Sequence, residues 1–444
     1  MLITKWQILR SQPTHVYLVL VLVTALPLYY GSYQYRLRHP YGSPTQSSGR
    51  MPTGNFVADW TDTQVVAPFN QYPVASFCNR TTHWRPNLVF NLANADGQIA
   101  DVRGNVLDFL FYAIEAGASI MLPGIPQQNE GGTGNVNARK TDFAEFFDEK
   151  WFLKTMEETC PQMQIYKMQE GQELKAALPD YYKPRTRRMD EGFNNNRKAY
   201  LSDLESWLQA RRVLDDKSTK FTVVNVKPTL YNIDTRSLPH GLRRNFGQVL
   251  RVNPEIRRLA AMAVEQLRIQ YGLEIDSTQP IPRNAFYAVY LPDPSDTNLT
   301  TAYLSHAKAH NLDTLYIATP DPSDLSHLKL LGLSQPSPLT LLSASDLLPE
   351  IEQPLSPAEQ ALVDYSITLR ASVFGGMVKS SLSAQVAMTR NQWVEDRGVV
   401  VDPERVRHAE EGMWWDDGWS RVVGRIDEDG SREGAEGWGR GVWP

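Results

Sequence analysis

Short apolar segments alternate with helix-patterned segments along most of the chain, and this alternation is what most restricts the fold. The segment 88–93 (LVFNLA) is predicted to be a buried strand, and the turn-forming residues 94–97 follow it. Apolar side chains then recur with helical spacing over 106–116, and 119–123 is a second strand candidate. Strand, turn, helix and strand make a βαβ unit. It implies a parallel sheet, because the helix returns the chain to the end of the sheet where it started.

The second half of the chain repeats this pattern. Its predicted strands are 221–226, 285–291, 314–319 and 339–342, and its predicted helices are 253–271, 301–311, 324–331 and 357–368. We therefore expect an α/β fold with one domain at 88–220, a second at 221–392 and a cleft between them. Loops beyond the carboxyl ends of parallel strands are where such folds bind ligands.

The first 37 residues are predicted to anchor the chain in a membrane. No Asp, Glu, Lys or Arg occurs from Ser11 to Tyr35, and this segment reaches the roughly 20 residues that a helix needs to cross a bilayer. We expect one uncleaved signal-anchor transmembrane helix within 1–37, a stem and entry loop at 38–87, and the body in the lumen of the endoplasmic reticulum or Golgi. A signal peptide cleaved after the small residues Val23 and Ala25 is the alternative.

The charge distribution argues against nucleic acid as a partner. The chain has a net charge of −5. Five basic residues and no acidic residue precede Asp59, so this first segment carries +5 and the remainder of the chain carries −10. Binding to phosphate backbones requires a net basic face. The basic start is therefore assigned to the anchor and its stem.

The last part of the chain, 393–444, is predicted to be a poorly ordered tail. Gly, Trp and charged residues recur there without a sustained period. An aromatic ligand site within this tail is the alternative interpretation.

Two features fit a lumenal body. Asn79 and Asn298 begin Asn-x-Thr glycosylation acceptor sequences. Cys78 and Cys160 are the chain's two cysteines; they form either one disulfide in an oxidising compartment or two buried free thiols. Two cysteines without a nearby histidine cluster predict no zinc site. The acid pairs at 293–296 and 321–324 are interpreted as turns that begin helices, so we predict no metal site.

No nucleophile elbow, zinc-protease helix, P-loop or dinucleotide-binding motif occurs in its required context. However, the stretch 94–123 (NADGQIADVRGNVLDFLFYAIEAGASIMLP) resembles the N-terminal motif of protein O-fucosyltransferases. In that family a Gly/Asn-rich turn and an Arg precede a long helix and a strand that ends in Leu-Pro. Arg103 falls at the family's Arg position, counted back from Pro123. The segments 142–156 and 374–382 are similar to two later blocks of the family, in the same order.

The resemblance implies two Rossmann-like domains facing a cleft, the glycosyltransferase B type of fold. It also implies inverting transfer of fucose from GDP-fucose to a glycoprotein or small-molecule acceptor, without a metal and with no cofactor besides the nucleotide sugar. Asp96 would be the general base. The residues expected near the donor are Asn94, Gly97, Arg103, Ser380 and Ser381.

The chain also departs from the family's pattern. Where the family carries His-x-Arg, its diphosphate-binding motif, this chain has Tyr290, Leu291 and Pro292, and Leu382 replaces a Phe in the late motif. Proline provides no cation or side-chain donor for a leaving diphosphate. Either a basic residue from 185–188 or 243–244 substitutes, or the donor is different, or the chain is an inactive pseudoenzyme that serves as a binding or scaffolding protein. A secreted α/β enzyme of another chemistry is a further alternative.

Overall fold

The computed structural model describes sixteen stretches of the chain, and everything below concerns these residues. They are 53–63, 69–93, 95, 97–126, 140–167, 177–184, 196–211, 213, 221–230, 232–320, 325–335, 338–348, 355–378, 380–395, 413–424 and 441–444. The predicted membrane anchor lies outside them. Within the described stretches, no helix is long and apolar enough to cross a bilayer.

The first sheet has five strands in the order β5-β2-β1-β7-β6, all parallel. The strands are β1 (Arg85–Leu92), β2 (Ala118–Met121), β5 (Ile165–Tyr166), β6 (Ala177–Tyr182) and β7 (Thr222–Val226). β1 and β2 are joined by helix α5 (Ile99–Ala116) and pair in parallel, with Phe90 opposite Ile120. The βαβ unit predicted from the sequence is confirmed.

The second sheet has six strands in the order β10-β9-β8-β11-β13-β12. They are β8 (Tyr287–Tyr290), β9 (Thr314–Ala318), β10 (Thr340–Leu342), β11 (Val373–Met377), β12 (Met413–Asp416) and β13 (Ser420–Val423). All neighbours are parallel except β12 and β13. The chain is thus an α/β protein with two largely parallel sheets, as its alternating pattern predicts.

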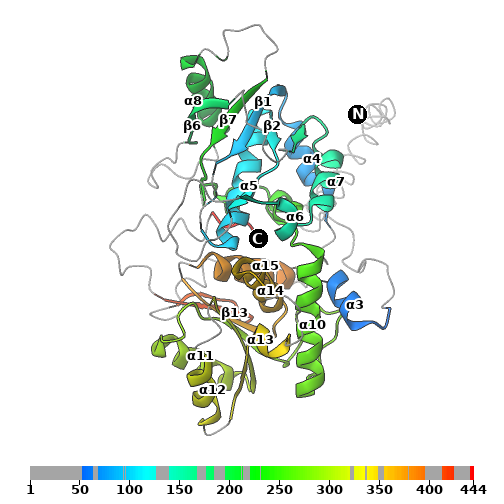
Figure 1. Ribbon diagram of the computed structural model, residues 1–444, viewed down its shortest axis with the longest axis vertical. Coiled ribbons are helices and arrows are strands. Elements are labelled where there is room, and N and C mark those ends of the chain that lie inside the picture. The colour runs from blue at the N-terminus through cyan, green and yellow to red at the C-terminus, as the bar shows by residue number, and fades with distance from the viewer. Residues whose placement is uncertain are drawn as a thin grey trace, which may run out of the picture. The chain divides into compact units, whose positions relative to one another are not determined.

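Helices cover both sheets, and α5 and α15 (Ser381–Glu395) lie between them (Figure 1). The other α-helices are α3 (Phe56–Thr63), α4 (Gln71–Asn79), α6 (Phe143–Phe146), α7 (Glu149–Thr159), α8 (Arg197–Ala210), α9 (His240–Phe246), α10 (Pro254–Tyr271), α11 (Thr297–Ala309), α12 (Leu325–Leu333), α13 (Ala344–Leu347) and α14 (Pro357–Leu369). Short elements complete the described fold: strands β3 (Ile125–Pro126) and β4 (Lys140–Thr141), and 3-10 turns η2 (Thr235–Ser237) and η3 (Gly247–Val249).

The structure differs from the predicted domain boundaries at two places. β7 pairs with β1 in the first sheet, so the boundary at residue 221 places this strand on the wrong side. The segment 393–444 is also not simply a poorly ordered tail. β12 and β13 extend the second sheet from β11, and Gly441–Pro444 is buried. Strands of four residues are too short for their period to be recognised in a sequence rich in Gly and Trp.

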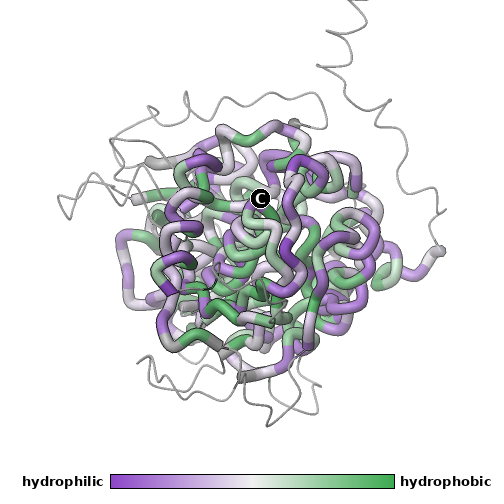
Figure 2. Tube along the Cα trace, turned by 90° about the horizontal axis from the view of Figure 1, so that it is seen from above, coloured by the Kyte–Doolittle hydropathy of each residue, from purple (hydrophilic) through white to green (hydrophobic). Residues whose placement is uncertain are grey.

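The core is made by both sheets and the helices packed on them. In Figure 2 the hydrophobic stretches gather toward the interior of the trace and the hydrophilic ones toward its rim. Arg390 of α15 is buried in this core. Its guanidinium donates to the carbonyl oxygens of Leu369 (2.8 Å), Ala371 (2.7 Å) and Trp419 (2.9 Å). A buried cation is tolerated only with such partners, so Arg390 joins the end of α14 to the loop between β12 and β13.

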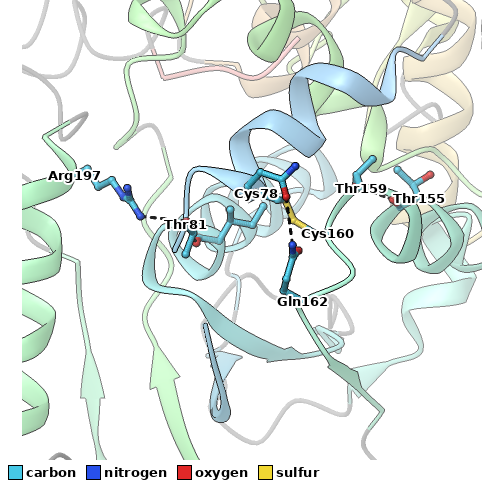
Figure 3. Close-up of a disulfide and its surroundings, with 9 residues drawn as sticks. Cys78, Thr81, Thr155, Thr159, Cys160, Gln162 and Arg197 are labelled. Carbon is cyan, nitrogen blue, oxygen red and sulfur yellow. Dashed lines mark hydrogen bonds between the residues drawn. A yellow bond between two sulfur atoms is a disulfide. The ribbon is translucent and has the colours of Figure 1, made fainter. Parts of the chain in front are cut away.

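Cys78 and Cys160 form a disulfide that joins the end of α4 to the end of α7 (Figure 3). Their Cα atoms are 5.5 Å apart, and both residues are fully buried. Of the two arrangements that the sequence left open, the structure has the disulfide. On the neighbouring surface, Gln162 donates to the Asn79 side chain over 3.3 Å.

Replacing both cysteines with serine should lower the free energy of unfolding by about 2–4 kcal/mol, because the disulfide closes a long loop in the unfolded chain. The two cysteines are 82 residues apart. Urea unfolding with and without a reducing agent measures the effect. The reductant should destabilise the wild type and leave the double variant unchanged. An identical urea midpoint for wild type and variant would contradict the expectation.

Candidate functional site

Side chains from the starts of helices α5 and α15 and from the end of strand β8 meet at one place. Tyr290, the last residue of β8, donates its hydroxyl hydrogen bond to Gln98 Oε1 over 3.2 Å. The Ser381 hydroxyl, at the start of α15, donates to Asp101 Oδ1 in the first turn of α5. We call Gly97, Gln98, Asp101, Tyr290, Ser380 and Ser381 the junction. It lies beyond the carboxyl ends of β1, β8 and β11, where ligands of parallel α/β folds bind.

The turn that leads into α5 places Gly97, Gln98 and Asp101 of the junction. Gln98 is the N-cap of this helix, and its backbone N–H donates to Asp101 Oδ2 over 2.9 Å. Gly97 precedes it with a φ of 111°, in the region that favours glycine. A Cβ there would also lie 2.6 Å from Asp101 Oδ2. Glycine at this position therefore allows the Asp101 carboxylate to fold back over the helix start.

Ser380 and Ser381 of the junction are placed by the close approach of α15 to β11. Ser380 caps α15, since its hydroxyl accepts from the Ser383 backbone N–H over 3.1 Å. The Ser383 hydroxyl in turn accepts from the backbone N–H of Met377 over 3.1 Å. A Cβ on Gly376 would lie 2.7 Å from the Ser383 Cβ, so this contact requires glycine. The N-termini of α5 and α15 thus meet at the junction, and helix N-termini favour negative charge.

Arg103 does not lie with these residues. Its buried guanidinium donates to the main-chain oxygens of Gly247 (3.0 Å), Trp443 (3.1 Å) and Pro444 (3.1 Å). Gln385, one turn beyond Ser381, donates to the carbonyl oxygen of Ala100 over 2.6 Å. The expected donor-binding arginine therefore lies beside the junction and is engaged by the end of the sequence.

Some of the remaining predicted residues lie outside the described stretches, and the others can be placed in the structure. Asn94 and Asp96 lie outside the described residues, so the general-base role of Asp96 stays a prediction. At the positions that depart from the family, Tyr290 and Leu382 are buried and Pro292 is half-buried. Burial raises the pKa of the Tyr290 hydroxyl. The two acceptor asparagines, Asn79 and Asn298, are exposed.

Asp364 is a buried carboxyl group that the sequence reasoning missed. It lies on α14 and accepts hydrogen bonds from the Tyr316 hydroxyl and from the backbone N–H of Thr319, at the carboxyl end of β9. Burial raises its pKa to about 7. The same reasoning also missed Gln98 and Asp101. Their capping-box spacing was the available signal for these two, and an acid on the apolar face of helix 357–368 was the signal for Asp364.

The acid pairs behave as turns where they are described. The Asp293 carboxylate accepts from the Ser295 backbone N–H over 2.8 Å, and Asp296 caps α11 by accepting from the Leu299 N–H over 2.9 Å. Residues 321–324 are not described. Within the described stretches, no group of three or more His, Cys, Asp or Glu side chains could hold a metal ion.

No family model matches the chain, and no curated protein matches it. Among solved structures, it is similar to POFUT1 in complex with GDP-fucose, with 13% identity, a TM-score of 0.41, and coverage of 77% of this chain and 99% of that one. It is also similar to the fucosyltransferase NodZ from Bradyrhizobium, with 14% identity, a TM-score of 0.37, and coverage of 70% and 93%. An Arabidopsis thaliana FUT1 structure in complex with GDP has 9% identity, a TM-score of 0.38, and coverage of 77% and 79%.

Asp364 should make stability depend on pH. Its folded-state pKa is about 7 against an ordinary 3.8, so the folded state holds a proton that the unfolded chain releases. The protonated Asp364 therefore adds to the free energy of unfolding. This contribution is complete below about pH 4, and it falls as the pH rises to about 7, by at most about 1.4 kcal/mol per pH unit. Asp364→Asn should remove this decline in urea unfolding free energies. The exposed Asp293→Asn is the control and should keep it; a decline that persists in Asp364→Asn would contradict the expectation.

Proposed function

We propose that the chain is a metal-independent glycosyltransferase that transfers a sugar, fucose from GDP-fucose, to a glycoprotein or small-molecule acceptor. One observation carries the proposal. The two sequence blocks that resemble O-fucosyltransferases, 94–123 and 374–382, lie far apart in the sequence and meet through the hydrogen bond from Ser381 to Asp101. The donor identity comes from the resemblance of these blocks.

The junction offers chemistry suited to a leaving diphosphate. Two helix N-termini, which favour negative charge, converge there. The hydroxyls of Tyr290 and Ser381 donate to Gln98 and Asp101, so a phosphate oxygen would take the place of these acceptors. Fixed donors aimed at developing negative charge stabilise a transition state without the reorganisation that water would need. In this proposal Gly97 allows the donor's close approach, and Asp96 remains the proposed general base for the acceptor hydroxyl.

We further propose that the body lies in the lumen of the secretory pathway, held by a membrane helix within 1–37. The disulfide between Cys78 and Cys160 supports an oxidising compartment. The exposed Asn79 and Asn298 are compatible with glycan attachment there. A glycosidase-sensitive mass at either asparagine would support the lumen, and access of a cytosolic protease to the body would exclude it.

A nucleotide panel tests the donor. GDP and GDP-fucose at millimolar concentration should raise the melting temperature of the purified protein, since a ligand that binds only the folded state stabilises it. UDP is the matched control and should have no effect. Stabilisation by none of the three would rule out the transferase proposal and leave a non-catalytic binding protein.

Pro292→Arg should restore a cation at the end of β8. Because a charge-assisted hydrogen bond contributes about 1.5–3 kcal/mol, we expect GDP to bind about tenfold tighter or more. Pro294→Arg adds the same charge two residues farther along, in the turn after the strand, and serves as the control. Calorimetric titration of both variants measures the affinities. Equal GDP affinity in both would show that residue 292 does not face the donor phosphates.

A further inference from the structure

The last four residues of the sequence, Gly441–Pro444, lie inside the molecule; we call them the tail segment. Their end, marked C, lies within the trace in both Figure 1 and Figure 2. Val442 and Trp443 are each 1% exposed. The Thr235 hydroxyl donates to the carbonyl oxygen of Val442 over 2.8 Å. The Trp443 ring packs on Phe246 and Phe111, with centroids 4.7 and 5.8 Å apart.

Trp443 bridges two buried ionisable side chains of α5. Its carbonyl oxygen accepts from the Arg103 guanidinium over 3.1 Å, and its indole N–H donates to Asp108 Oδ1 over 2.7 Å. Arg103 and Asp108 are 7% and 0% exposed. Burial raises the pKa of Asp108 well above its ordinary value. The tail segment thus provides main-chain oxygen atoms that accept from the Arg103 cation. It also provides an N–H group that donates to the Asp108 carboxyl group.

We call the residues around the tail segment the pocket: Arg103, Asp108, Phe111, Thr235, Phe246 and Gly247. Gly247 leaves room in it for the main chain of the segment. A Cβ on Gly247 would lie 1.9 Å from the Pro444 oxygen and 3.1 Å from the Arg103 guanidinium. The hydrogen bonds described for Arg103 go to oxygens of Gly247, Gln385, Trp443 and Pro444, and none of these oxygens belongs to an Asp or Glu side chain. A guanidinium binds anionic oxygens more strongly than carbonyl oxygens.

We propose that the tail segment is an internal ligand of this pocket, and that a diphosphate group competes with it for Arg103. The identity of the competing ligand rests on the proposed function, while the occupation of the pocket does not. Departure of the segment would expose Arg103, which lies two residues after Asp101 on α5 and 3.5 Å from the side-chain oxygen of Gln385 on α15. A site that is open for only a fraction of the time binds with its affinity reduced by that fraction, so the docked segment lowers the affinity for diphosphates.

The first test uses the full chain and inorganic pyrophosphate, which carries neither base nor sugar. Hydrogen exchange of the amides of Val442 and Trp443 is followed by mass spectrometry while pyrophosphate is added. We expect exchange to rise and to saturate as pyrophosphate displaces the segment. Unchanged or slower exchange at saturating pyrophosphate overturns the proposal, as does the absence of pyrophosphate binding.

The second test weakens the segment. Trp443→Ala removes the ring and the N–H donor, and should tighten pyrophosphate binding about tenfold or more by raising the open fraction. Trp443→Phe keeps an aromatic ring for Phe111 and Phe246, and should give a smaller gain. Gly247→Ala should act like Trp443→Ala, because its Cβ would overlap the Pro444 oxygen. Adding Arg103→Gln to each variant should abolish the gain; affinity that stays equal or falls in the weakened variants contradicts competition.

The tetrapeptide Gly-Val-Trp-Pro provides a readout that does not depend on the donor. Added to the Trp443→Ala chain, it should compete with pyrophosphate, whereas Gly-Val-Ala-Pro should not. If pyrophosphate and the peptide compete but GDP-fucose does not bind, the internal-ligand proposal stands and the proposed donor fails. If the Trp443→Ala chain does not fold, the exchange experiment on the full chain decides.

Discussion

The fold depends on the burial of α5, a helix whose described side chains are almost all inside the protein although three of them are charged. Arg103, Asp108 and Glu115 are each at most 7% exposed. A buried charge without a partner costs several kcal/mol, so each needs compensation from elsewhere in the chain. Glu115 pairs with Arg80 and Arg197, Asp108 accepts from Trp443, and Arg103 donates to Gly247 and the tail segment.

These partners determine which parts of the chain surround α5. Arg80 follows α4, Arg197 begins α8, Gly247 begins η3, and Trp443 comes from the end of the sequence. Each contact therefore holds a different element against the same helix. The junction at the start of α5 depends on these contacts, because Asp101 accepts the hydrogen bond from Ser381 only when α5 and α15 are held together. The polar groups inside the core thus position the candidate site as well as the fold.

The sequence predicted local structure well and long-range neighbours poorly. The βαβ unit over β1, α5 and β2 followed from apolar spacing within 36 residues, 88–123. Membership of β7 in the first sheet did not, because pairing with β1 depends on tertiary contacts that a strand pattern does not record. The same holds at the junction: the sequence motifs pointed to Gly97, Ser380 and Ser381, whose roles stay predictions, whereas the contact between Arg103 and Trp443 joins residues 340 positions apart. Nothing in the sequence near either residue indicates it.

The placement of β13 has a consequence for the order in which the chain can fold. This strand pairs with β11, and the loop before it supplies Trp419 and Ser420 as partners of buried Arg390. Until residues 413–424 have been synthesised, β11 lacks a neighbour on one side and Arg390 lacks these acceptors. An open parallel edge and an incompletely satisfied cation both disfavour the native packing. The second sheet can therefore be completed only late in synthesis, whereas the strands of the first sheet are all made by residue 226.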